Sequence, residues 1–195
     1  MRGIVISVAA ALLAGCASNP PPPPAPPVDT SSPLYAPNYL SMAASGDQFE
    51  IQSSQLAMQM SQNPGVRQIA QMLITDHSRM SQEMMAAATS AGLTPPPPGL
   101  RPEHAQMLQQ LQSTPAGSFD MAYRDIQISA HQQALQLHQN YASGGDNPAL
   151  QAVATNAVPA IQNHLTALQS LAVAPPPPPP PPPAYQQPAR PGERG

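Results

Sequence analysis

The chain has 195 residues and a formal net charge of −3, and only 9% of its residues are charged, with no lysine among them. Proteins that bind nucleic acid through its phosphates need a basic patch, so this composition excludes that class of function. The apolar residues include ten methionines but only two phenylalanines and no tryptophan, which favours packed helices over a β-sandwich.

The N-terminus has the pattern of a bacterial lipoprotein signal. Arg2 precedes an apolar run over residues 4–14, which is too short to span a bilayer as a helix. The run ends in Leu-Ala-Gly-Cys, which resembles the lipobox and implies removal of residues 1–15 and a lipid on Cys16. Ala17 and Ser18 follow in place of an aspartate, so we expect the outer membrane rather than the inner one. An ordinary secretory signal with an accidental cysteine is the alternative.

Proline-rich segments flank the central part of the chain. Residues 16–37 predict an extended tether, because a run of prolines from Pro20 favours polyproline II at about 3.1 Å per residue. Residues 174–195 predict a similar tail that starts with a proline block at Pro175. We expect both to be spacers in the cell envelope, with peptidoglycan or envelope proteins as neighbours. A ligand for a proline-binding domain is the alternative.

The central domain, residues 38–173, predicts an all-α four-helix bundle. The predicted helices cover residues 38–61, 63–91, 118–143 and 147–171, and each carries a narrow apolar stripe at three- and four-residue spacing. The second and fourth helices begin with an Asn-Pro pair, in which asparagine caps the helix and proline takes its first position. Four such helices of similar length are typical of a four-helix bundle.

The connection between the second and third helices, residues 92–117, is too long for a tight turn. Prolines at 95–98 precede a short helix predicted at about 102–112. Together these pieces span about 38 Å, the length of a 25-residue helix. The connection can therefore cross the whole bundle, as in ferritin-like folds. An up-down bundle capped at one end by this segment is the alternative.

Four titratable side chains lie at matched distances from the two Asn-Pro turns. They are Glu50 and His77 in the first hairpin, and His131 and His164 in the second. Residues equidistant from the turn of an antiparallel helix pair lie side by side, so we expect all four near the middle of the bundle. Burying an unpartnered carboxylate or imidazole costs several kcal/mol, so these groups must bind one another, water or a metal ion.

Two explanations for this constellation stay open. Three imidazoles and one carboxylate suit a single zinc, iron or manganese ion. Alternatively, Glu50 and the histidines form a structural polar layer, which we favour, while a catalytic acid–base pair is a third and less favoured interpretation. The di-iron sites of ferritin-like proteins need a Glu-x-x-His motif on two helices. The residues before His77 and His164 do not form that motif, so a di-iron oxidase is not expected.

Several other polar residues have predicted roles. Asp76 lies about a quarter-turn from the histidine that follows it, where it could reach an arginine or orient a neighbouring imidazole. Asp120 and Arg124 have the i,i+4 spacing of a surface ion pair. His104 and His138 lie on polar faces, so we expect both to be solvated. The methionines near residue 80 could be soft ligands for copper(I), but flexible core packing is the favoured explanation.

These motifs together resemble the bacterial family designated domain of unknown function 4142. The residues that carry the resemblance are Glu50, Asp76-His77, Phe119-Asp120-x-x-Tyr123, Gln127, His131, Pro159 and His164-Leu165. The resemblance covers residues 38–171 and implies a ferritin-like bundle in the cell envelope, with Tyr123 among the supporting residues. It implies no activity.

We therefore expect a lipid-anchored, periplasm-facing bundle that acts as a structural, interaction or stress-related module without enzymatic activity. Its expected partner is the membrane, through the lipid on Cys16, and no nucleic acid is expected. The alternative is a metal-binding or redox protein that uses Glu50, His77, His131 and His164.

Overall fold

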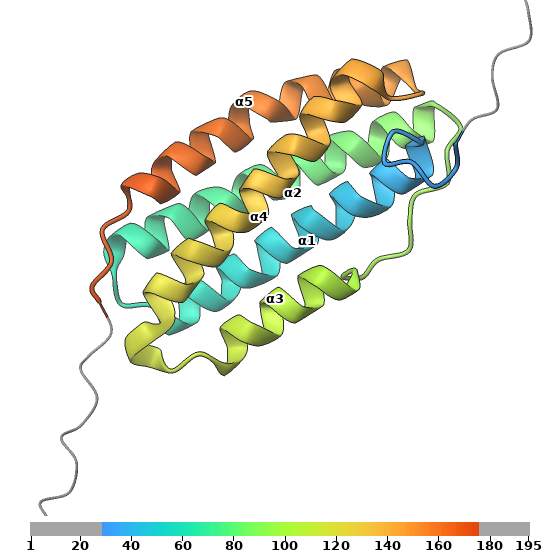
Figure 1. Ribbon diagram of the computed structural model, residues 1–195. Coiled ribbons are helices and arrows are strands. Elements are labelled where there is room, and N and C mark those ends of the chain that lie inside the picture. Colours follow the sequence, from blue (N-terminus) through green and yellow to red (C-terminus); the bar gives the residue numbers. More distant parts are fainter. Residues whose placement is uncertain (1–28, 176–195) are drawn as a thin grey trace, which may run out of the picture.

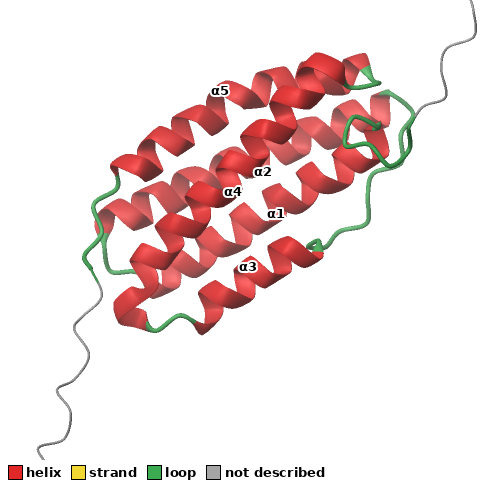
Figure 2. Cartoon of the chain, in the orientation of Figure 1, coloured by secondary structure: helices red, strands yellow, loops and turns green. Residues whose placement is uncertain are grey.

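The computed structural model describes residues 29–175 and contains five helices in that range, with no strand (Figure 1; Figure 2). The helices are α1 (Ala36–Met60), α2 (Pro64–Ser90), α3 (Pro102–Ser113), α4 (Ala116–Gly144) and α5 (Pro148–Ser170). The predicted signal peptide, Cys16, most of the tether and nearly all of the tail lie outside the described residues. Within 29–175, each helix is too short or too polar to cross a membrane.

The long helices form a four-helix bundle with a crossover connection. The α1–α2 hairpin packs beside the α4–α5 hairpin, so that α1 contacts α4 and α2 contacts α5. The chain returns along the outside of the bundle through α3, which packs on α1 and α4, and α2 and α4 therefore run in the same direction (Figure 1). The prediction of an all-helical bundle is confirmed. Of the two predicted topologies, the structure has the ferritin-like crossover.

The two Asn-Pro pairs cap their helices as predicted. The Asn63 side chain accepts a hydrogen bond from the Gly65 N–H at 2.9 Å, and Asn147 accepts from Ala149 and Leu150 at 3.0 and 3.2 Å. These bonds satisfy backbone donors that have no partner inside the helix. Each pair thus fixes the point at which the returning arm of a hairpin begins.

The start of α1 depends on a residue from the other hairpin. Asp146 Oδ1 accepts from the Ala36 N–H at 2.8 Å and from the Tyr141 hydroxyl at 3.0 Å. This contact lets the helix begin at Ala36, two residues earlier than the sequence predicted, because a distant carboxylate supplies the cap. The turn before α5 therefore also holds the first turn of α1.

The core consists of apolar packing at both ends of the bundle and a polar layer in the middle. At one end, the rings of Tyr39 and Tyr141 stack with their centroids 3.8 Å apart. At the other end, the rings of Phe119 and Tyr123 stack in a cluster that includes Phe49. The layer between them holds the side chains whose common height was predicted: Glu50, His77, His131 and His164, all at most 3% exposed.

Met80 and Met84 pack in the core, as the favoured explanation predicted. Met84 lies in the apolar cluster at one end of the bundle, whereas Met80 packs beside Ala157 and Ile161 near the polar layer. The two side chains are therefore part of different packing groups within the described core. A flexible thioether fills the irregular space beside polar groups.

Candidate metal centre

Three histidines from three helices converge in the polar layer. They are His77 on α2, His131 on α4 and His164 on α5, and all are at most 2% exposed. One ring nitrogen of each lies within 4.8 Å of a nitrogen of the other two. The ring centroids are 5.3 to 5.4 Å apart. Within residues 29–175 this is the one group of at least three His, Cys, Asp or Glu side chains that is spaced to hold a metal ion.

Hydrogen bonds to oxygen acceptors fix the orientation of the first two rings. His77 Nδ1 lies 2.9 Å from Asp47 Oδ1, and His131 Nδ1 lies 2.9 Å from the backbone carbonyl of Gln127. A carbonyl or carboxylate oxygen can only accept, so the Nδ1 atom of each ring carries the proton. In each neutral imidazole, Nε2 is then left with a lone pair.

The third ring has the opposite tautomer. His164 Nε2 donates to Asp76 Oδ2 at 3.0 Å, and in a neutral ring this leaves the lone pair on His164 Nδ1. One nitrogen of every ring is thus occupied by an oxygen outside the centre. The nitrogens that remain free are His77 Nε2, His131 Nε2 and His164 Nδ1. This is the arrangement in which metal-binding histidines are held, with the second nitrogen bonded to a carboxylate or a backbone carbonyl.

The free nitrogens have no donor to satisfy them. His131 Nε2 and His164 Nδ1 lie 3.3 Å apart, and in the neutral tautomers described above both present a lone pair to this contact. His77 Nε2 is buried, and among the described residues none forms a hydrogen bond with it. Buried polar atoms normally have a partner. A cation placed among the three nitrogens would satisfy all of them.

Burial disfavours a proton as that cation. Burial and, to a smaller extent, the neighbouring His164 lower the pKa of His77 from 6.5 to about 3, against an opposing effect of Asp76. Burial also holds the pKa of His131 well below its ordinary value, with His77 and His164 as further causes. These imidazoles are therefore neutral at physiological pH, which is the form in which histidine binds a metal ion.

A carboxylate lies beside each of the three imidazoles. Two of them are the hydrogen-bond acceptors Asp47 and Asp76, and the third belongs to Glu50, whose Oε1 lies 3.4 Å from His131 Nδ1. Burial raises the pKa of Asp47 to about 7, against an opposing effect of His138. Burial also raises the pKa of Glu50 well above 4.5, and the nearby Asp47 adds to this rise. Carboxylates at these positions could balance the charge of a buried dication.

The predicted ligand set is thus only partly brought together. The three histidines converge, but Glu50 is not part of the group spaced to hold an ion. Its carboxylate lies near the Nδ1 side of His131, whereas the free nitrogen of that ring is Nε2. Helical periodicity places Glu50 in the correct layer but cannot decide on which side of a ring its carboxylate lies.

The predicted supporting residues have mixed outcomes. Asp76 orients the neighbouring imidazole of His164 and also lies 3.8 Å from the Arg79 guanidinium. The Tyr123 hydroxyl is buried and hydrogen-bonds to Ser54 Oγ at 2.9 Å, away from the three free nitrogens.

The predicted ion pair between Asp120 and Arg124 is wrong. Arg124 instead contacts Asp125 at 2.8 Å. Asp125 directly follows Arg124 in the sequence, and its side chain is 57% exposed. Asp120, in contrast, lies half-buried in the second turn of α4. Arg124 therefore pairs with the adjacent, solvated carboxylate.

Sequence reasoning missed two buried polar residues, one in the layer and one two helical turns away from it. Asp47 was not singled out, although its position three residues before Glu50 places both on one face of α1. His138 was expected to be solvated, which is wrong. It is 8% exposed, and its Nδ1 shares a hydrogen bond with the Tyr39 hydroxyl at 2.9 Å. The seven-residue spacing from His131 to His138 is two helical turns and is the signal that would have found it.

The second histidine that was expected to be solvated, His104, is half-buried. Its Nδ1 forms a hydrogen bond with Ser45 Oγ at 2.7 Å, and its ring stacks on Phe49. It therefore fastens α3 to α1 instead of standing free in solvent.

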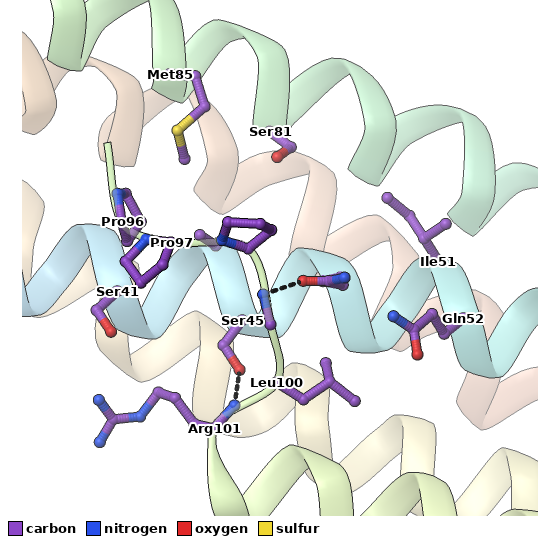
Figure 3. Close-up of a pocket in the computed structure, with 14 residues that line it drawn as sticks. Ser41, Ser45, Ile51, Gln52, Ser81, Met85, Pro96, Pro97, Leu100 and Arg101 are labelled. Carbon is purple, nitrogen blue, oxygen red and sulfur yellow. Dashed lines mark hydrogen bonds between the residues drawn. The ribbon is translucent and has the colours of Figure 1, made fainter. Parts of the chain in front are cut away.

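A hollow in the described surface is lined by none of the three histidines of the centre. It has a volume of about 690 Å³ and lies where the proline-rich linker passes over α1 and α2 (Figure 3). Gly99 N–H donates to Gln48 at 2.9 Å, and Arg101 N–H donates to Ser45 at 2.8 Å, which fixes the linker along this groove. The remaining lining is mainly serine, glutamine, proline and aliphatic side chains. The path of the linker accounts for the groove.

Comparisons with solved structures identify the same fold. One match is the protein described as "CopM in the Cu(II)-bound form", with a TM-score of 0.59 and 19% identity, covering 69% of this chain and 93% of that one. Another is the "DUF305 fragment from Deinococcus radiodurans", with a TM-score of 0.54 and 20% identity, covering 67% and 91%. At these identities the likeness extends to the fold alone.

Sequence comparisons give the family. No curated protein matches the chain. Residues 20–171 match the family "Domain of unknown function (DUF4142)", a range that includes every helix of the bundle and all three converging histidines. The chain therefore belongs to the DUF4142 family.

Proposed function

We propose that this protein binds one divalent transition-metal ion at His77, His131 and His164, as a lipid-anchored protein of the cell envelope. The observation that carries the proposal is the convergence of three buried imidazole nitrogens whose partner nitrogens are all engaged by oxygens. A structural polar layer needs a donor inside the cluster. The free nitrogens here present only lone pairs in the neutral tautomers that their acceptors select.

The chemistry of the donor set favours Zn²⁺ or Cu²⁺. Imidazole nitrogen suits zinc, copper, iron and nickel, whereas Mn²⁺ prefers oxygen ligands. Divalent copper binds a given nitrogen site more tightly than the other first-row ions do, and Zn²⁺ is bound by three histidines when a fourth position stays open. A solved structure with this fold is described as Cu(II)-bound, which supports a test of copper first.

The proposed location follows from the N-terminus. Removal of residues 1–15 would leave Cys16 as the first residue, and acyl chains on it would anchor the protein, since each buried methylene contributes about 0.8 kcal/mol. The proline-rich segment after Cys16 would hold the bundle away from the membrane surface. Metal binding in the envelope is then the molecular role that we assign to the bundle.

Metal analysis of the purified protein tests this proposal. The full chain is prepared without chelators and then titrated with CuCl₂ and with ZnCl₂ by calorimetry. We expect one equivalent to bind, and we expect His131→Ala to lose this binding. His104→Gln is the matched control, because His104 lies on α3 and its Nδ1 is engaged by Ser45. Wild-type protein that binds neither ion, or a His131→Ala variant that binds as well as wild type, would refute the metal centre.

A further inference from the structure

A small cavity lies beside the centre, between α1 and α4 and beneath the first turn of α3. Its volume is about 80 Å³, and it is separate from the large groove over α1 and α2. We call it the side cavity, and its polar lining residues are Asp47, Glu50, His77, Glu103, Gln133 and His138. Aliphatic side chains from the same helices complete its wall. The cavity therefore combines an apolar wall with carboxylates from two helices.

The side cavity runs from the surface to the centre. Among its lining residues Glu103 and Gln133 are exposed to solvent, whereas His77 is only 2% exposed. His77 is also one of the three histidines assigned to the metal centre. The cavity thus connects solvent with a ligand that is otherwise enclosed by four helices.

Two carboxylates of α1 face this cavity at successive turns. Glu50 is 3% exposed, and the part of the chain that the structure describes offers no hydrogen bond to its Oε2. Asp47 is 8% exposed and uses Oδ1 to hold His77 at 2.9 Å. Burying a carboxylate oxygen that accepts no hydrogen bond costs folding free energy. A cation in the cavity would give this oxygen a partner. The unpartnered oxygen of Glu50 therefore indicates a second position for a cation, outside the three histidines.

We propose that the side cavity is the route by which the metal ion reaches the three histidines, with Glu50 and Asp47 holding the partly hydrated ion beside His77. The proposal rests on the metal-binding function proposed above and adds the path to it. Transfer is a ligand exchange in which imidazole nitrogens replace carboxylate oxygens and water, with no change in oxidation state. A water molecule takes about 30 Å³ of liquid volume, so the cavity has room for an ion with a few of its waters.

The charge and the walls of the cavity favour this role. Carboxylates lining a cleft with low-dielectric walls focus the field and raise the association rate of a cation by about 10- to 1,000-fold. The lining contains the exposed Glu103, which pairs with Arg101 at 2.7 Å, and the buried Glu50 and Asp47, so acidic side chains stand at both its exposed and its buried parts. The final step carries the ion past the Nδ1 edge of His77, which Asp47 holds at 2.9 Å, to the free Nε2 of the same ring.

Gly46 offers a way to block the cavity without disturbing its walls. It lines the cavity, and a Cβ added there would have His104 Cε1 as its nearest neighbour at 3.8 Å, an ordinary contact. Gly46→Ala should therefore fold normally, since alanine is the better helix former by about 1 kcal/mol. Gly46→Leu extends a larger side chain into the same space.

The test is stopped-flow uptake of CuCl₂ by the metal-free full chain, followed by the quenching of tyrosine fluorescence, together with release into excess EDTA. We expect Gly46→Leu to slow uptake and release by the same factor and to leave the equilibrium affinity unchanged, as an obstruction in a path does. Gly46→Ala should slow them less. Glu50→Gln should slow uptake by about tenfold or more, because an amide cannot give up a proton to become the charged oxygen ligand that attracts the ion.

The outcomes separate the path from the site. If wild-type protein binds one equivalent and both Gly46→Leu and Glu50→Gln load at the wild-type rate, the path is overturned and the metal centre stands. If wild-type protein binds no copper or zinc, the metal centre falls and the path falls with it. Glu50→Gln keeps the test decisive if circular dichroism shows that the leucine variant does not fold.

Discussion

The hydrogen bond between Asp47 and His77 should set the affinity of the metal centre, and Asp47→Asn tests this. Asparagine has nearly the same volume and keeps an Oδ1 acceptor, but it removes the negative charge. It can also present its amide N–H to His77 Nδ1, which would move the imidazole proton to Nε2 and turn the metal-facing lone pair into a donor. The same change of tautomer is the known consequence of replacing the aspartate beside a catalytic histidine.

The size of the effect follows from the contact. The bond is 2.9 Å long and its carboxylate is 8% exposed, so solvent screens it little. A hydrogen bond to a charged group contributes about 1.5–3 kcal/mol, and about 1.4 kcal/mol changes an affinity tenfold. We therefore expect Asp47→Asn to weaken Zn²⁺ binding by about 10- to 100-fold, the range measured for such outer partners.

A competition titration against a chromophoric zinc chelator measures this change. Asp76→Asn should have a smaller effect, because the Asp76 side chain is 32% exposed and water can replace part of its contact with His164. Asp125→Asn on the exposed face of α4 is the control and should leave the affinity unchanged. Urea unfolding in EDTA should show that Asp47→Asn changes the stability of the metal-free protein by at most about 1 kcal/mol. An affinity within a factor of two of wild type would refute the reasoning.

Three further predictions concern stability and location. Free Zn²⁺ at 100 times its dissociation constant should raise the free energy of unfolding of the wild-type protein by about 2.7 kcal/mol. His77→Ala should abolish this stabilisation, and equal stabilisation of both proteins would place the ion elsewhere. Asn147→Ala should lower the free energy of unfolding by about 1 kcal/mol in a urea titration, because two N–H groups lose their cap; an unchanged midpoint would argue against the cap. Cys16→Ser should move the protein from the membrane fraction to the soluble fraction, and retention in the membrane would contradict the lipid anchor.

Residue spacing alone predicts the four long helices and the polar layer that they share. Apolar residues at three- and four-residue spacing define the buried face of a helix, and an Asn-Pro pair fixes where two of the helices begin. Distance from a turn then sets height in an antiparallel hairpin. These rules are local or involve one hairpin, and they are enough to place His77 and His164 at one level of the bundle.

The orientation of these side chains depends on contacts between helices that are distant in the sequence. A helical pattern fixes the face on which an imidazole lies, but the nitrogen that turns inward depends on acceptors from other helices, such as Asp47 for His77 and Asp76 for His164. The length of the linker allowed two topologies, and the packing of α3 against α1 and α4 selected the crossover. Burial of His138 likewise required the Tyr39 hydroxyl from another helix. Orientation, tautomer and solvent access arise from contacts between distant segments, which residue spacing does not encode.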